Sequence, residues 1–192
     1  MGREFELKYR ADAGKILQIR EKHGCFASIS METAYYDTPE GKLGELRWTL
    51  RRRLENGRSV CTLKTPGKGG GRGEWETECD DILTAIPELC KLGGPEALMS
   101  LTEGGLVLSC GARFARLAKE LTVPGGTVEL ALDEGVLLGS GKELPFAEVE
   151  VELKTGSEEA AVAFAEALAA EFGLVAEPRS KVQRALALAR ES

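Results

Sequence analysis

Apolar and polar residues alternate along most of this chain, which is the pattern of half-buried β-strands. Asn56-Gly57 separates two alternating segments and predicts a tight hairpin. Asp133-Glu134-Gly135 predicts a turn at the end of another alternating segment. The predicted strands cover residues 3–10, 26–37, 46–54, 58–65, about 73–80, 112–123, 127–133 and 145–154.

The other segments show helical periodicity. Asp12 is a candidate N-cap for a helix over 13–23. Ser157 opens an alanine-rich helix that runs to Phe172 and ends at Gly173, and Ser180 could cap a last helix over 181–190. Residues 81–104 look helical but are interrupted by Pro87, Gly93-Gly94 and Pro95, while Pro66 to Gly73 predicts a glycine-rich loop.

No internal repeat or break in composition divides the chain, so we predict a single domain over residues 1–192. Many antiparallel strands with few helices favour an α+β fold, in which a closed β-barrel has its helices packed on the outside.

Charged side chains keep to one face of the predicted strands. Carboxylates two residues apart on one face repel each other unless a cation lies between them, and Mg²⁺ or Mn²⁺ prefers such oxygen ligands. The middle strands supply Arg and Lys, which bind phosphate oxygens. The pattern favours a metal site beside a polyphosphate site, with the apolar faces outward. The same-face sets are Glu4, Glu6 and Lys8; Arg51 and Arg53; Thr62 and Lys64; Arg72, Glu74, Glu76 and Glu78; and Glu148, Glu150, Glu152 and Lys154.

Composition limits the class of protein. The net charge of −6 disfavours a non-specific nucleic-acid binder. Five cysteines without a CxxC pair indicate neither a disulfide framework nor a zinc site. No apolar run reaches the roughly 18 residues of a membrane span, and the charged N-terminus does not resemble a signal peptide. We expect a cytoplasmic protein with reduced thiols and no membrane or nucleic-acid partner; the oligomeric state stays open, with a homodimer as one option.

The first strand, EFELK, matches the E-x-E-x-K signature of the CYTH superfamily, the triphosphate tunnel metalloenzymes. YYDTPEGKL, LRRR followed by TLK, RGEWE, LDEG, AEVEVELK, and SK with Arg184 resemble the family's other motifs in order. The resemblance spans nearly the whole chain and is weakest from about 81 to 111. It implies an eight-stranded antiparallel barrel, open as a tunnel, and divalent-metal-dependent chemistry on inorganic triphosphate, thiamine triphosphate, RNA 5′-triphosphate ends or ATP.

The resemblance also implies residue roles. Glu4, Glu6, Glu150 and Glu152 would hold the first metal, with Glu148 as an alternative ligand. Asp133, with Glu76 as a further candidate, would serve a second metal or position the attacking water; Lys8 completes the catalytic set as an electrostatic clamp. The residues implied to bind phosphate are Lys8, Arg51, Arg53, Lys64, Arg116, Lys181 and Arg184. Strand alternation directs Arg52 outward and puts Arg113 and Arg116 on opposite faces of one strand.

The substrate is the least determined point. Aromatic residues make up only 6% of the chain, and alternation puts Trp75 and Tyr9 on apolar faces and Trp48 opposite Arg51. This favours inorganic tripolyphosphate, hydrolysed with Mg²⁺ or Mn²⁺, over a substrate that carries a ring. Thiamine triphosphatase and class IV-type adenylate cyclase are the alternatives, and a non-catalytic polyphosphate-binding module is a third.

Overall fold

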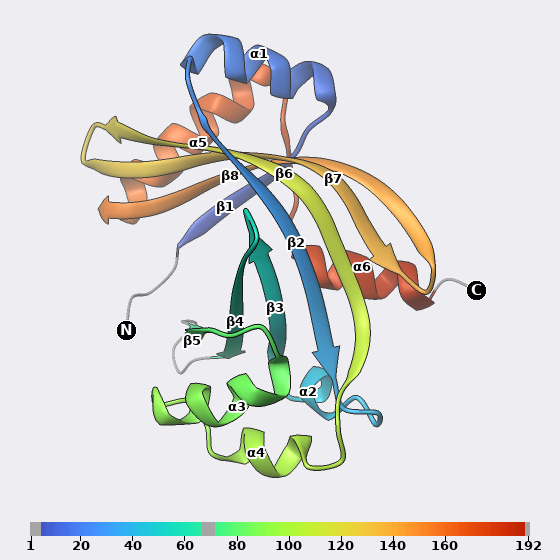
Figure 1. Ribbon diagram of the computed structural model, residues 1–192. Helices are drawn as coiled ribbons and strands as arrows, with labels where there is room; N and C mark the ends of the chain where they lie inside the picture. Colours follow the sequence, from blue (N-terminus) through green and yellow to red (C-terminus); the bar gives the residue numbers. More distant parts are fainter. Residues whose placement is uncertain (1–4, 67–71, 191–192) are drawn as a thin grey trace.

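The computed structural model describes residues 5–66 and 72–190. In this part of the chain nine antiparallel strands form one sheet in the order β5-β4-β3-β2-β6-β7-β8-β1-β9 (Figure 1). The strands are β1 (Glu6–Arg10), β2 (Ala27–Asp37), β3 (Thr49–Glu55), β4 (Arg58–Pro66), β5 (Arg72–Glu78), β6 (Val107–Val123), β7 (Gly126–Gly139), β8 (Lys142–Gly156) and β9 (Val175–Ala176).

Three long strands, β6 to β8, form the centre of the sheet. The predicted turn at Asp133 is wrong, because β7 runs through it to Gly139. Asp133 pairs with Arg116 on one side and Glu148 on the other, so both neighbouring strands continue the ladder. The predicted hairpin at Asn56-Gly57 is confirmed: both residues have positive φ, of 50° and 85°, as its tight turn requires.

Two helices cover the convex face of β1, β7 and β8. They are α1 (Ala13–His23) and α5 (Glu158–Phe172), and both begin at the predicted caps. Their core includes Val149 and Val151 of β8, which are fully buried with Ile19 of α1. The outward apolar faces of the alternation are therefore confirmed.

A second apolar core lies outside β3 and β4, built on Leu50 and Leu63. It is covered by α3 (Ile82–Lys91) and α4 (Ala97–Thr102), with α2 (Lys42–Glu45) contributing Leu43. The sequence pattern missed α2 and β9, and placed the start of β6 five residues too late.

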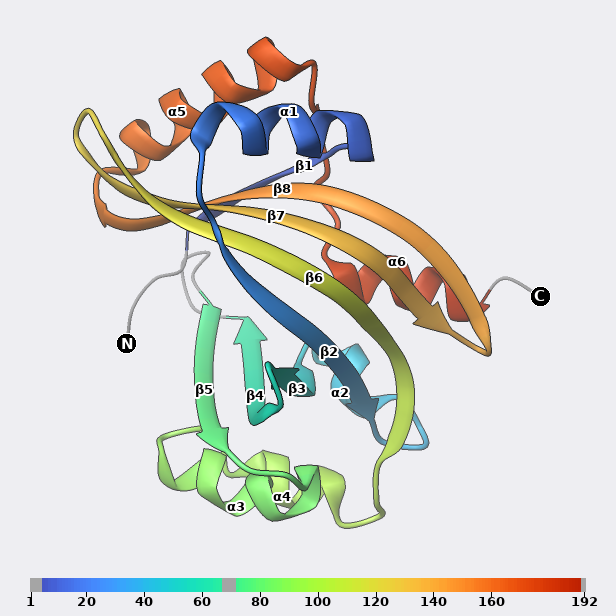
Figure 2. The same cartoon turned by 45° about the horizontal axis from the view of Figure 1, so that its top comes forward.

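The last helix, α6 (Lys181–Arg190), lies on the concave side of the sheet, so the prediction that the helices pack on the outside is wrong for α6 (Figure 2). Its apolar residues contact Phe114 and Leu137 of the concave face. Gly139 permits this approach, because a Cβ there would lie 2.7 Å from the carbonyl oxygen of Ala185.

The expected closed eight-stranded barrel is not confirmed. Within residues 5–66 and 72–190 the sheet has nine strands, with β5 and β9 as unpaired edges. Figures 1 and 2 show the sheet curving so that β3 to β5 face the concave side of β6 to β8. The edge strand β9 has only two residues, which leaves little edge to pair. No helix of the described chain is long and apolar enough to span a membrane.

Candidate functional site

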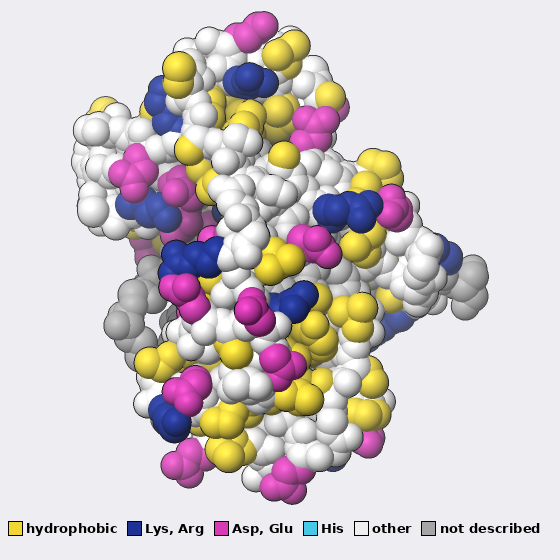
Figure 3. Space-filling model, viewed as in Figure 1, with side chains coloured by type: hydrophobic (Ala, Val, Ile, Leu, Met, Phe, Trp, Pro, Cys, Tyr) yellow, Lys and Arg dark blue, Asp and Glu magenta, His cyan; other side chains and the backbone are white. Residues whose placement is uncertain are grey.

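The concave side of the sheet encloses a cavity of about 1290 Å³. Eight cationic and eight acidic side chains of the described residues line it, so the lining carries no net charge. They are Lys8, Arg47, Arg51, Arg53, Lys64, Arg116, Lys154 and Lys181, with Glu6, Asp37, Glu55, Glu74, Glu76, Glu129, Glu150 and Glu152. On the face shown in Figure 3, Lys and Arg side chains likewise lie beside Asp and Glu.

Three glutamates stand side by side across β1, β8 and β7. The register pairs Glu152 with Glu6 on one side and with Glu129 on the other. Lys8 lies 3.1 Å from Glu6, and Lys154 lies 3.1 Å from Glu152. Glu4 lies outside the described residues. These side chains point to one face because their positions differ by two on each strand, as the alternation predicts.

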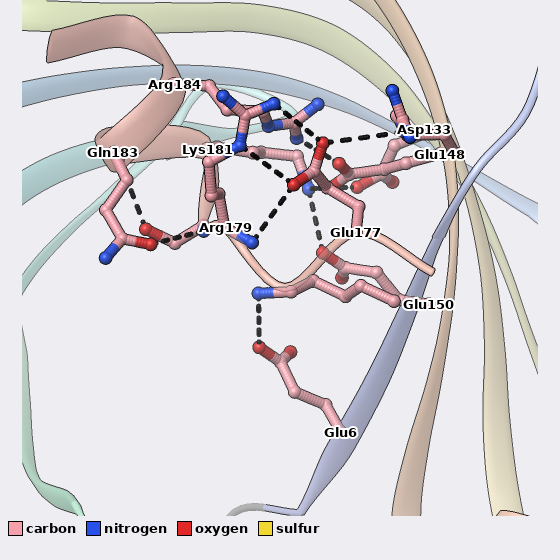
Figure 4. Close-up of polar contacts among 12 residues, drawn as sticks. Glu6, Asp133, Glu148, Glu150, Glu177, Arg179, Lys181, Gln183 and Arg184 are labelled. Atoms are coloured by element: carbon pink, nitrogen blue, oxygen red, sulfur yellow. Dashed lines mark hydrogen bonds and ion pairs between the residues drawn. The ribbon is translucent and has the colours of Figure 1, made fainter. Parts of the chain in front are cut away.

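A denser ion cluster lies where α6 meets β7 and β8 (Figure 4). The carboxylates of Asp133, Glu148 and Glu150 have oxygens within 4.8 Å of one another, a donor set that could hold a metal ion. In this structure cations bridge them. Arg116 donates to both Asp133 oxygens at 2.8 and 2.7 Å, and Lys181 lies 2.7 Å from Asp133 and 2.8 Å from Glu150.

The cluster shifts the acidity of its members. Burial would disfavour the charged form of Lys181, but Asp133 and Glu150 outweigh it and raise the Lys181 pKa. Burial likewise opposes the charged form of Glu150, but Lys181 and Arg116 hold its pKa well below the usual range. Burial raises the pKa of Glu148, which is fully enclosed. Lys181 therefore stays protonated at neutral pH.

The opposite wall is basic, and its ion pairs differ in closeness: Arg53 contacts Glu55, whereas Arg51 comes no nearer than 3.7 Å to a carboxylate. Arg51 and Arg53 project from β3 and Lys64 from β4, with Lys64 3.1 Å from Glu74. The Nε atoms of both arginines are buried without a hydrogen-bond partner among the described residues. Burial, followed by the charge of Arg51, lowers the pKa of Arg53. Glu76 accepts a hydrogen bond from Thr62 at 2.9 Å.

The structure separates the predicted site residues into two groups. Lining the cavity are Glu6, Lys8, Arg51, Arg53, Lys64, Glu76, Arg116, Glu150, Glu152 and Lys181. Asp133, Glu148 and Arg184 lie behind this lining, with 0%, 0% and 8% of their surface exposed. Arg52 and Arg113 point away from the cavity, as predicted. Arg52 donates to the carbonyl oxygen of Asp80, and exposed Arg113 pairs with Glu143.

The sequence prediction missed several residues that lie in or beside the cavity. Glu129 and Glu177 were given no role, although Glu129 shares its strand face with Asp133 and could have been found by alternation. Glu177 carries no such signal, because it stands in the link before α6. Trp48 was expected away from the site but lines the cavity, because it precedes β3, where strand alternation does not apply. Tyr9 and Trp75 pack in apolar clusters as predicted.

The five cysteines and the single histidine are the remaining side chains with reactive or metal-binding chemistry. The five cysteines are free thiols, as expected, and burial raises the pKa of Cys61 to about 11 and that of Cys110 to about 12. His23 packs edge-on against Phe164 on the convex side. None of these six side chains lines the cavity.

Solved structures share this fold. A proposed adenylyl cyclase from Hippeastrum, described as having a dominant triphosphatase activity, superposes with a TM-score of 0.69 at 20% identity, covering 98% of this chain and 97% of that one. A proposed adenylate cyclase from Bacillus halodurans gives 0.67 at 18% identity over 96% and 98% of the two chains. A Pyrococcus horikoshii protein gives 0.65 at 23% identity over 96% and 99%.

Sequence comparison identifies a relative and a matching family model. An inorganic triphosphatase of Haemophilus influenzae is 28% identical over 159 residues, which are 82% of this chain and 45% of the relative. The chain thus spans about half the length of this curated relative. The model of the CYTH domain matches residues 2–186. Since that match takes in every strand and α6 as far as Leu186, the chain belongs to the CYTH domain family.

Proposed function

We propose that this protein hydrolyses a triphosphate substrate with the help of a divalent cation, and that inorganic tripolyphosphate is its preferred substrate. The observation that carries the proposal is the pair of buried Nε donors of Arg51 and Arg53, without partners in the described chain, in the same cavity as the Glu6–Glu152–Glu129 row. Unmet guanidinium donors in a charged cavity gain most from phosphate oxygens.

Charge balance supports a metal. The lining carries as many acids as bases, so a polyanion entering alone would add several uncompensated negative charges. A divalent cation on the acidic strands would offset them. We assign its ligands to Glu6, Glu150 and Glu152, with Glu4 and Asp133 as further candidates, because Glu6 and Glu152 are direct cross-strand neighbours. When bound, Mg²⁺ or Mn²⁺ polarises phosphate oxygens and lowers the pKa of water.

The protein's own residues then hold and orient the substrate. Arg51, Arg53 and Lys64 on one wall, with Lys8, Arg116 and Lys181 on the other, surround the phosphates from both sides. Fixing the chain of phosphates in line is the larger part of catalysis in phosphoryl transfer. We assign Glu76, which lines the cavity and is oriented by Thr62, to positioning the attacking water.

Relatives support the reaction type. The Haemophilus influenzae relative is an inorganic triphosphatase, and the Hippeastrum protein has a dominant triphosphatase activity. A triphosphate with an aromatic ring, such as thiamine triphosphate or ATP, is the second candidate. Trp48 and Tyr36 favour it, because both line the same cavity and offer ring surfaces.

The test is phosphate release from tripolyphosphate, ATP and thiamine triphosphate with Mg²⁺, with Mn²⁺ and after exhaustive chelation. We expect metal-dependent release, fastest from tripolyphosphate, and a loss of about 100-fold in Glu6→Gln because an oxygen ligand loses its charge. Glu143→Gln, an exposed acid on β8, is the matched control. Binding of tripolyphosphate without release would support the non-catalytic module, and activity that survives chelation would refute the metal.

A further inference from the structure

The helix on the concave side, α6, contacts a carboxylate that does not line the cavity, that of Glu148. We propose that Glu148 and Arg184 are positioning residues that anchor the first turn of α6 and set Lys181 in the cavity wall, rather than a metal ligand and a phosphate ligand. The effect on turnover rests on the proposed function, whereas the anchor itself is a property of the fold.

Glu148 divides its two oxygens between two residues of α6. Its Oε1 accepts from Lys181 Nζ and its Oε2 from Arg184 Nη2. Positions three apart lie on one face of a helix, so a single carboxylate of β8 ties down one turn. The two cations also lie over the ring of Phe146, with Lys181 Nζ 5.6 Å and Arg184 Cζ 5.4 Å from its centroid.

Accessibility separates these residues by role. Lys181 and Glu150 line the cavity, and they lie 2.8 Å apart. Glu148 is fully buried and Arg184 is 8% exposed, and neither contributes to the described cavity lining. A phosphate or a metal in the cavity therefore meets Lys181 and Glu150 first, and the pair behind them only if α6 moves.

Local charge is already balanced around Glu148. Three carboxylates, of Asp133, Glu148 and Glu150, face three cations, of Arg116, Lys181 and Arg184. A buried carboxylate is tolerated when paired cations offset its desolvation. Since Glu148 is paired on both oxygens, a divalent ion there would have to displace Lys181 or Arg184.

The link that enters α6 is fixed from the other side. Glu177, 3% exposed, accepts from the backbone N–H of Arg179 at 3.1 Å and from Arg179 Nε at 3.0 Å, and its own N–H donates to the Lys8 carbonyl at 2.9 Å. Ser180 and Gln183 then form a reciprocal cap, with bonds of 2.8 and 3.2 Å. The start of α6 is thus tied to β1 through the backbone and to β8 through Glu148.

The test compares Glu148→Gln and Arg184→Met with the control Glu143→Gln on the same strand. Three quantities are measured: the affinity of substrate-free protein for Mn²⁺ by electron paramagnetic resonance, hydrogen exchange of the α6 amides, and kcat and KM for tripolyphosphate at saturating Mn²⁺. We expect Mn²⁺ affinity within about twofold of wild type, exchange in the first turns of α6 about tenfold faster, and a KM about tenfold higher because Lys181 is no longer held.

A double variant sharpens the result. Adding Lys181→Met to Glu148→Gln should raise KM little further, since both changes act through one group. Weaker Mn²⁺ binding in Glu148→Gln with unchanged exchange in α6 would make Glu148 a ligand and overturn the proposal, as would unchanged exchange in Arg184→Met. If Glu148→Gln does not fold, Arg184→Met decides through the same exchange measurement. If the wild type releases no phosphate, the proposed function fails while exchange still decides the anchor.

Discussion

The two walls of the cavity hold their charges in different ways. On the wall of β7, β8 and α6, every cation of the buried cluster contacts at least one carboxylate within 3 Å, and Lys181 contacts three. On the wall of β3 and β4, Arg53 contacts Glu55, but Arg51 approaches Glu74 and Glu76 only to 3.9 and 3.7 Å. The Nε atoms of Arg51 and Arg53 have no partner in the described chain and belong to residues that line the cavity, whereas the unpaired Nε of Arg184 on the first wall lies behind the lining.

The difference teaches that charge of one sign can serve two purposes within one cavity. Cations of the first wall neutralise buried carboxylates, so removing one of them would leave an uncompensated buried charge even before any ligand arrives. On the second wall, burial lowers the pKa of Arg53 in spite of its contact with Glu55, and a phosphate would relieve that cost. The first wall should therefore dominate stability, and the second should dominate affinity for the substrate.

The largest effect is expected at the centre of the first wall. Lys181→Met leaves Asp133, Glu148 and Glu150 with one cation fewer, and breaking such a buried group typically costs about 3–5 kcal/mol of unfolding free energy. Urea denaturation measures it. Arg53→Met, of the same design on the second wall, should change stability by less than about 1 kcal/mol or raise it, because burial of Arg53 outweighs its pairing with the partly exposed Glu55. Equal losses in the two variants would erase the distinction between the walls.

The next effect concerns the substrate. Arg53→Ala should lower kcat/KM for tripolyphosphate by about 10- to 100-fold, the worth of a charge-assisted contact in a partly buried site. Arg52→Ala, one residue away, should change it by less than about twofold, because Arg52 points outward to the carbonyl of Asp80. Steady-state kinetics at saturating metal checks both variants. A comparable loss in Arg52→Ala would mean that kcat/KM depends on the positive charge near the cavity and not on the direction in which the side chain points.

How far the sequence reaches can be judged on β7 and β8. Period-two alternation correctly placed Val149 and Val151 in the outer core and Glu150 and Glu152 at the cavity, because side-chain direction is a local property of a strand. It failed at Asp133, where the sequence Asp133-Glu134-Gly135 resembles a turn. What keeps Asp133 in a strand is Arg116 across the ladder, a partner 17 positions away.

The position of α6 was beyond the sequence for a related reason. Helical periodicity and the Ser180 cap predicted the helix at its observed bounds. An amphipathic helix can cover either face of a sheet, however. The choice here depends on Gly139 of β7 and Glu148 of β8, which lie far from α6 in the sequence. The same limit applies to closure, since the edges β5 and β9 are set by the curvature of the whole sheet.

The smallest effect expected is a pH dependence at the tie before α6. A hydrogen bond from Arg179 lowers the pKa of Glu177 to about 2, from an ordinary value of 4.5. A depressed carboxyl pKa means that the ionised form stabilises the fold: the contribution is complete above about pH 4.5 and is lost as the pH falls toward 2. Glu177→Gln removes this contribution, so its melting temperature should lie below that of wild type near neutral pH. The gap should narrow steadily once the pH drops below about 4.5.

Thermal melts of both proteins across this range measure the gap, and taking their difference cancels the titration of other acids. Glu143→Gln, whose partner Arg113 is as exposed as Glu143 itself, should show a much smaller gap at every pH. A gap of constant size from neutral pH to about 3 would show that Glu177 acts through its shape and not its charge.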